Sequence, residues 1–168
     1  YFSKTVEILG KMLYNRTSHK RLKKIAGGNT MIRVLIGPKG TGKTKTFINM
    51  ANEALQTEKG NVVCITKGSR HTFDISSDIR LVNTDDFNIV SVKELYGFIS
   101  GMIAQNYDIT HIFIDSITKI TNATLGEVSD VVPALEKIAA DFNVDFTIAI
   151  SEEKEGAPEN IIKYAVNI

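Results

Sequence analysis

One short stretch restricts the fold of this chain more than any other part of it. Residues 37–44 read GPKGTGKT and fit the pattern G-x-x-x-x-G-K-[S/T] at every position. The apolar run MIRVLI at residues 31–36 precedes this stretch, and Phe47, Ala51 and Leu55 follow it at intervals of four residues. Such spacing is typical of one face of a helix. The sequence therefore predicts a buried strand, a glycine-rich turn and a helix, in that order.

This order of elements is the setting in which a glycine-rich turn binds phosphate. The glycines let backbone N–H groups point into one concavity at the positive end of the helix. Lys43 would place its charge on the β- and γ-phosphates, and the Thr44 hydroxyl is a suitable ligand for Mg²⁺. The alternative is a glycine-rich turn that contains Lys and Thr by chance. We predict that the nucleotide is bound by Gly37, Pro38, Lys39, Gly40, Thr41, Gly42, Lys43, Thr44 and Lys45.

Further apolar runs along the chain alternate with helical patterns. Strands are expected at residues 61–66, 111–115 and 144–150, and a brief apolar piece lies at residues 79–82. Strands that alternate with helices at this spacing favour a mostly parallel sheet, because parallel neighbours are joined by right-handed crossovers. The fold class predicted is α/β, as a three-layer α/β/α sandwich.

Local signals predict where the helices begin and end. Gly60 is expected to close the first helix. Ser91 and Glu94 form a capping-box pattern in front of an amphipathic run. Asp130 is expected to cap a later helix that has Pro133 in its first turn, where the missing N–H does no harm. A short terminal helix is expected from Pro158.

Polar residues follow several of the expected strands directly. In open α/β sheets, ligands bind beyond the carboxyl ends of the strands. Asp115 comes straight after the apolar run IFI, and its carboxylate could hold the water shell of Mg²⁺ opposite Thr44. An Asp after a strand can also begin a loop or cap a helix. The residues expected at this edge, besides the glycine-rich turn, are Thr66, Lys67, Asp115, Ser116 and Ser151.

The charge of the chain is unevenly distributed. Residues 1–30 carry seven Lys or Arg and one Glu, a balance of +6, so the remaining thirteen basic and eighteen acidic residues give −5. The basic part ends in the linker-like run AGGNT, and Met31 opens the first strand. We expect residues 31–168 to form the nucleotide-binding domain. Residues 1–30 are interpreted either as a fusion- or vector-derived segment or as a native basic arm.

Composition and charge indicate which cellular compartment and which kinds of partner to expect. Cys64 is the single cysteine and cannot form an intrachain disulfide, which favours a reducing, cytoplasmic setting. No apolar stretch approaches the roughly 20 residues needed to cross a bilayer, so membrane insertion is not expected. The balance of −5 beyond residue 30 argues against a broad surface for nucleic acid.

The two motifs together resemble a known superfamily. The stretches GPKGTGKT and HIFID are similar to the Walker A and Walker B motifs of the P-loop NTPases, and the resemblance runs from Met31 to about Ser151. The late strand that ends in Ser151 resembles the RecA-like ATPases, in which a polar residue at this place senses the γ-phosphate. The chain also resembles small clostridial ATP-binding proteins of unassigned function. The resemblance implies ATP and Mg²⁺ as ligands, with Lys43 and Asp115 as catalytic residues and Thr44 and Asp115 as the magnesium ligands.

One position departs from the RecA-like pattern. These ATPases use a carboxylate, usually Glu, to orient the attacking water, whereas Ser116 follows Asp115 in this chain. Glu152 and Glu153 stand just past the last strand and are the acids that could replace it, although glutamates in such a run commonly mark a solvated loop. Arg70 and Arg80 could reach a phosphate as arginine fingers do.

Three functional classes follow from this pattern. The first is a slow Mg²⁺-dependent ATPase that couples its nucleotide state to a protein partner or to a second copy of itself. The second is a nucleotide-binding switch with negligible turnover, consistent with Ser116. The third is a small-molecule or nucleotide kinase, which is disfavoured because residues 45–168 contain only Arg70 and Arg80 as arginines and no lid-sized insertion.

Overall fold

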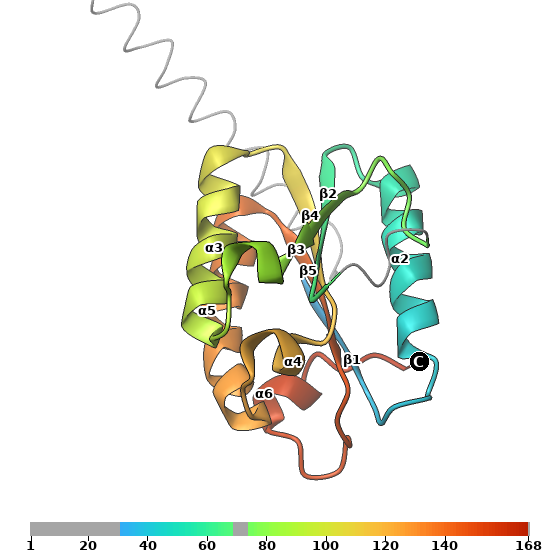
Figure 1. Ribbon diagram of the computed structural model, residues 1–168, viewed down its shortest axis with the longest axis vertical. Helices are drawn as coiled ribbons and strands as arrows, with labels where there is room; N and C mark the ends of the chain where they lie inside the picture. Colours follow the sequence, from blue (N-terminus) through green and yellow to red (C-terminus); the bar gives the residue numbers. More distant parts are fainter. Residues whose placement is uncertain (1–30, 69–73, 168) are drawn as a thin grey trace, which may run out of the picture. The chain divides into compact units, whose positions relative to one another are not determined.

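A parallel sheet forms the centre of the part of the chain that the structure describes (Figure 1). The computed structural model describes residues 31–68 and 74–167. The expectations for residues 1–30 and for Arg70 fall outside these ranges, and the division of the chain at Met31 stays a prediction. The described strands are β1 (Ile32–Ile36), β2 (Asn61–Thr66), β3 (Arg80–Asn83), β4 (Ile109–Ile114) and β5 (Asp145–Ile150).

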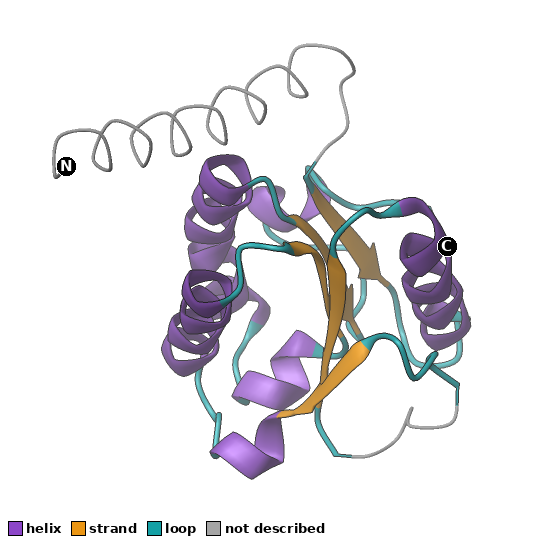
Figure 2. Ribbon diagram, turned by 90° about the horizontal axis from the view of Figure 1, so that it is seen from above, coloured by secondary structure: helices purple, strands orange, loops and turns teal. Residues whose placement is uncertain are grey.

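The strands are arranged in the order β1-β5-β4-β2-β3, and all neighbouring pairs are parallel. Helix α2 (Lys43–Thr57) covers one face, and α3 (Val92–Gln105) and α5 (Leu125–Phe142) cover the other (Figure 2). Two short helices complete the described part, α4 (Ile117–Thr121) and α6 (Glu159–Ile162). The predicted three-layer α/β fold with a largely parallel sheet is confirmed, and the architecture is P-loop-like.

Alternate residues of each strand enter two separate apolar cores. On β4, Ile112 and Ile114 belong to the core shared with α3 and α5, whereas Phe113 belongs to the core under α2. The rings of Phe113 and Phe47 meet edge to face, with centroids 5.6 Å apart. Strands of a parallel sheet are buried on both faces, and this explains why their sequences read as continuous apolar runs.

The chain after α6 covers the outer edge of β1. The Val34 amide donates to the Tyr164 carbonyl at 2.8 Å, and the Val166 amide donates to the Val34 carbonyl at 3.0 Å. These bonds satisfy backbone groups that an edge strand would otherwise expose. They fix β1, and with it the start of the glycine-rich turn, from the side opposite to β5.

Two predicted helix boundaries are wrong. Helix α5 begins at Leu125, capped by Thr124, whose side chain accepts from the Glu127 amide while the Glu127 carboxylate accepts from the Thr124 amide. Asp130 therefore lies inside the helix, and Pro133 lies beyond its first turn. The sequence TLGE carries a complete capping box earlier in the chain, and that signal outweighs a single Asp.

Gly60 does not close α2, because the helix ends at Thr57 and the Glu58 amide donates to the Ala54 carbonyl. A Cβ at Gly60 would lie 2.2 Å from the Asp108 carbonyl oxygen and 2.4 Å from Thr110 Cγ2. The glycine is thus required by close packing between the loops that precede β2 and β4. Among the described residues, no helix is both long and apolar enough to cross a bilayer.

Candidate functional site

The glycine-rich turn leads from β1 directly into α2. Gly40 and Gly42 have φ of 94° and 88°, a left-handed conformation that side chains disfavour. A Cβ built on either glycine meets no described atom within 4 Å, so the space above the turn is open. Within the described residues, α2 has no side-chain cap and no acid in its first turn. Its first N–H groups and the positive end of its dipole therefore face that open space, which suits an anion.

Lys43 lies at the base of this turn. Its side chain is buried, and Nζ donates to the Pro38 carbonyl at 2.5 Å and to Thr41 Oγ1 at 3.1 Å. Burial lowers the pKa of Lys43, the nearby charge of Lys119 lowers it further, and Asp115 acts in the opposite direction. The ammonium group is thus held against the turn by neutral oxygens.

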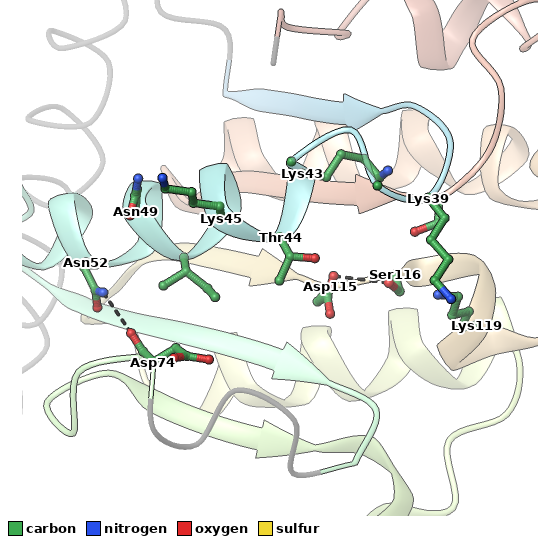
Figure 3. Close-up of a pocket in the computed structure, with 14 residues that line it drawn as sticks. Lys39, Lys43, Thr44, Lys45, Asn49, Asn52, Asp74, Asp115, Ser116 and Lys119 are labelled. Atoms are coloured by element: carbon green, nitrogen blue, oxygen red, sulfur yellow. Dashed lines mark hydrogen bonds between the residues drawn. The ribbon is translucent and has the colours of Figure 1, made fainter.

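Asp115 follows the last residue of β4. Its backbone amide donates to the Ile65 carbonyl at 2.9 Å, which fixes the strand end against β2. Ser116 then adopts a left-handed φ of 56°, and its hydroxyl donates to Asp115 Oδ1 at 3.2 Å. Figure 3 shows the Thr44 hydroxyl and the Asp115 carboxylate pointing toward one another across the cavity. These are two hard oxygen ligands of the kind that Mg²⁺ prefers.

A cavity of about 760 Å³ opens along the turn and the exposed side of α2 (Figure 3). Its described lining contains four lysines and two aspartates, so positive charge exceeds negative charge at the surface a ligand would touch. The volume is in the range of small-molecule sites. The lining residues are Lys39, Gly40, Gly42, Lys43, Thr44, Lys45, Ile48, Asn49, Asn52, Asp74, Asp115, Ser116, Lys119 and Ser151.

Lys119 is a cavity residue that sequence reasoning missed. It lies on α4, and the Lys67 ammonium donates to its backbone carbonyl at 2.9 Å, linking α4 to the loop after β2. Figure 3 shows the side chains of Lys119 and Lys39 converging on the same part of the cavity. The available signal was the spacing of Lys119 four residues after Asp115, which places it one helical turn beyond the strand end.

One side of α2 forms the other missed part of the site. Lys45, Ile48, Asn49 and Asn52 recur at intervals that place them on one helical face, and all line the cavity. Asn52 also fixes the far wall, because its Nδ2 donates to the Asp74 carbonyl at 3.1 Å and its Oδ1 accepts from the Ser76 amide at 3.0 Å. The polar residues of this face were the sequence signal.

The remaining predicted residues are placed as follows. Ser151 lines the cavity at the end of β5, and the Gly37 amide donates to the neighbouring Ile150 carbonyl at 3.3 Å. Glu152 and Glu153 are exposed and are not among the described lining residues, so their catalytic role stays a prediction. Arg80 is exposed at the start of β3, away from the strand ends that form the site. The roles of Lys43, Thr44, Asp115 and Ser151 likewise stay predictions, although these residues share one cavity.

The residues present fit a nucleotide with its magnesium ion. The open space above Gly40 and Gly42, the uncapped start of α2 and the excess of lysine suit a chain of phosphates. Thr44 and Asp115 supply oxygen ligands beside it. A parallel α/β sheet whose first strand leads into such a turn defines the class of the molecule as a P-loop-like three-layer fold.

Comparisons with known proteins add little to this classification. No protein-family model and no curated protein matches the chain. The solved structures that it is similar to include that of PCH-2 from C. elegans, at 15% sequence identity and a TM-score of 0.48. The match covers 96% of this chain and 40% of that one, so this chain spans less than half of PCH-2.

Proposed function

We propose that this chain binds ATP with Mg²⁺ in the cavity between the glycine-rich turn and Asp115, and hydrolyses it slowly. One observation carries the proposal. The uncapped N-terminus of α2, the excess of lysine and the facing oxygens of Thr44 and Asp115 all border the same cavity. A phosphate cradle beside two oxygen ligands for Mg²⁺ is the arrangement that P-loop NTPases use to bind a magnesium nucleotide.

Each residue has a distinct role in this proposal. The N–H groups of the turn and of the first turn of α2 bind the phosphates. Lys43 exchanges its contacts with Pro38 and Thr41 for phosphate oxygens, whose negative charge offsets the cost of burying its ammonium group. Thr44 and Asp115 hold the magnesium ion, and the bound ion neutralises charge on the β- and γ-phosphates. Lys119 and Lys39 add positive charge on the side where the γ-phosphate would lie.

Slow turnover is proposed because the lining of the cavity, as far as the structure describes it, contains no glutamate next to the proposed magnesium ligands. The position after Asp115 is Ser116, whose hydroxyl is already bonded to Asp115. The same observation favours the second candidate, a nucleotide-binding switch whose ATP and ADP states differ without significant hydrolysis. In both cases the nucleotide state would be read by a protein partner or by a second copy of the chain.

The test is nucleotide binding measured by calorimetry, followed by phosphate release from the same samples. Lys43→Ala should weaken ATP binding by on the order of 10- to 100-fold, since a hydrogen bond to a charged group contributes about 1.5–3 kcal/mol. Lys59→Ala removes the same charge from an exposed position beyond the far end of α2 and should leave the affinity unchanged. Equal affinity of the wild type and Lys43→Ala would rule out the site. Binding without phosphate release would favour the switch over the ATPase.

A further inference from the structure

A second group of polar side chains lies at the opposite end of the strands from the nucleotide cavity, on the side of the sheet where the strands begin. Glu58 follows the C-terminus of α2, His111 lies near the start of β4, and Asp145 is the first residue of β5. One ligand atom from each of the three lies within 4.8 Å of the others. Asp145 and Ile150 are the two ends of β5, so this group is about 17 Å from the strand ends that border the nucleotide cavity.

His111 is the central member of this group. Its side chain is 4% exposed, it stacks on Phe113 with ring centroids 4.1 Å apart, and Nε2 lies 3.0 Å from Thr147 Oγ1. Its other ring nitrogen, Nδ1, is buried and has no hydrogen-bond partner among the described residues. Glu58 Oε1 is the facing oxygen, but at 3.9 Å it is too distant for a hydrogen bond. A buried nitrogen without a partner is costly and needs an explanation.

The contact between Nε2 and Thr147 bears on which ring nitrogen of His111 carries the proton. If Nε2 carries the proton and donates to Thr147, Nδ1 presents a lone pair toward the carboxylate of Glu58, which cannot donate to it when ionised. A ring lone pair and two carboxylates, with one ligand atom of each residue within 4.8 Å of the others, are complementary to a cation. A histidine that binds a metal typically donates its other N–H to a neighbouring acceptor, as Nε2 would do here.

We propose that Glu58, His111 and Asp145 bind a divalent transition-metal ion of the zinc type. An imidazole nitrogen with two carboxylate oxygens is a common ligand set for such an ion, whereas Mg²⁺ prefers oxygen ligands alone. Metal–ligand bonds of about 2.0–2.2 Å require the three atoms to move closer together than 4.8 Å. Glu58 and Asp145 are 25% and 24% exposed, so they have room to close on the ion and leave a path for it to enter.

One feature of the surroundings opposes the binding of the ion, and two features favour it. Arg33 lies 3.7 Å from Asp145, so the cation must compete with this guanidinium, which is itself 26% exposed. In favour, Glu58 stands at the C-terminal end of α2, where the helix dipole attracts cations. Burial and the charge of Arg33 lower the pKa of His111 to about 3, so the ion displaces no proton from the ring at neutral pH.

Bound there, the ion would join three segments that are distant in sequence. It would hold the end of α2 against the first residues of β4 and β5, and α2 begins at the phosphate-binding turn. The site does not depend on the proposed nucleotide function, since none of its residues lines that cavity. It would stabilise the fold whether or not ATP is bound.

The experiment is a titration of the full chain with Zn²⁺ by calorimetry, in excess Mg²⁺ so that zinc does not occupy oxygen sites near Asp115. Glu58→Gln and Asp145→Asn should each weaken the binding of one ion by at least about 10- to 100-fold, the range found for lesser changes around metal sites. Glu53→Gln removes the same charge from an exposed position on the same helix and should bind zinc like the wild type. Zinc should raise the unfolding temperature of the wild type and of Glu53→Gln, but not that of the other two variants.

A spectroscopic measurement identifies the ligand atom. Nitrogen NMR of the His111 ring should show zinc on Nδ1 and a proton on Nε2. Co²⁺ should give the absorption bands of a low-symmetry site in the wild type and in Glu53→Gln, but not in Glu58→Gln or Asp145→Asn. The same zinc affinity in Glu58→Gln and Asp145→Asn as in the wild type would overturn the proposal. So would a His111 ring spectrum that does not change on addition of zinc, a result that requires no variant to fold.

Discussion

The two ends of the parallel strands have opposite polar chemistry, although one helix, α2, reaches from one to the other. The carboxyl edge is the side of the sheet where the strands end, and the amino edge is the side where they begin. At the carboxyl edge, the uncapped start of α2 meets a cavity with four lysines and two aspartates in its described lining. At the amino edge, the end of α2 meets two carboxylates, a neutral imidazole and one arginine. The dipole of α2 favours an anion at its start and a cation at its end. One helix in a parallel sheet could in this way contribute to both proposed sites, with opposite charge preferences at its two ends.

The largest effect should come from a residue that belongs to the carboxyl edge alone. Asp115→Asn should reduce phosphate release by on the order of 100-fold, as expected when a group that stabilises transition-state charge is lost. It should also raise the Mg²⁺ concentration needed for tight ATP binding. The measurement is phosphate release and ATP affinity across a magnesium titration, with zinc affinity as the control. A loss of zinc binding in this variant would show that the two edges are not independent.

The second effect belongs to the amino edge and depends on pH. The pKa of His111 falls from its ordinary 6.5 to about 3 in the folded chain because the ring is buried beside Arg33. Above pH 6.5 the ring is neutral in both states and has no effect on stability. Between pH 6.5 and about 3 the unfolded chain binds a proton that the folded chain does not, so the free energy of unfolding decreases as the pH falls. The expected loss from this group is about 2 kcal/mol by pH 5.

Urea denaturation at pH 7 and pH 5 measures this loss, and His111→Gln is the control because it lacks the titrating ring. The variant should lose about 2 kcal/mol less than the wild type over the same interval. The same pH dependence in both proteins would show that His111 does not cause it.

The carboxyl edge could be predicted from the sequence because its main residues are consecutive. Residues 37–44 contain both the glycines that need positive φ and the lysine, and Asp115 directly follows an obvious strand. Lys119 and Asn52 were missed because helical spacing shows which residues share a face of a helix, but not which face borders the site. The strands were predictable for the same local reason, since both faces of a parallel strand are apolar.

The amino edge could not be predicted in this way. Glu58, His111 and Asp145 are more than thirty residues apart from one another, and no spacing rule links them. Only the strand order, with β5 between β1 and β4, brings Asp145 beside His111 and Arg33. That order depends on the crossovers between strands, which apolar periodicity does not encode.

A third and smaller effect tests the charge of the carboxyl edge. Lys119→Ala should lower the preference for ATP over ADP by about tenfold if Lys119 faces the γ-phosphate as proposed, because such a contact contributes about 1.5 kcal/mol. Competition between the two nucleotides measures the preference. Lys93→Ala, on the exposed start of α3, is the matched control. If Lys119→Ala weakens ATP and ADP binding equally, Lys119 does not act on the γ-phosphate.

The smallest effect is expected away from both edges, at the start of α5. It measures how much the loss of one helix cap changes the stability of the fold. Thr124 caps α5 with Oγ1, which accepts from the Glu127 amide, whereas Asp130 lies inside the same helix. Thr124→Ala should therefore lower the free energy of unfolding by about 1 kcal/mol, the usual cost of losing a cap. Asp130→Ala, on an exposed face of the helix, should change it by less than about 0.5 kcal/mol. Urea denaturation of both variants at pH 7 measures the difference, while their ATP and zinc affinities should equal those of the wild type. A larger loss in Asp130→Ala than in Thr124→Ala would mean that the helix begins at Asp130 after all, and the start of α5 would then have to be reassigned.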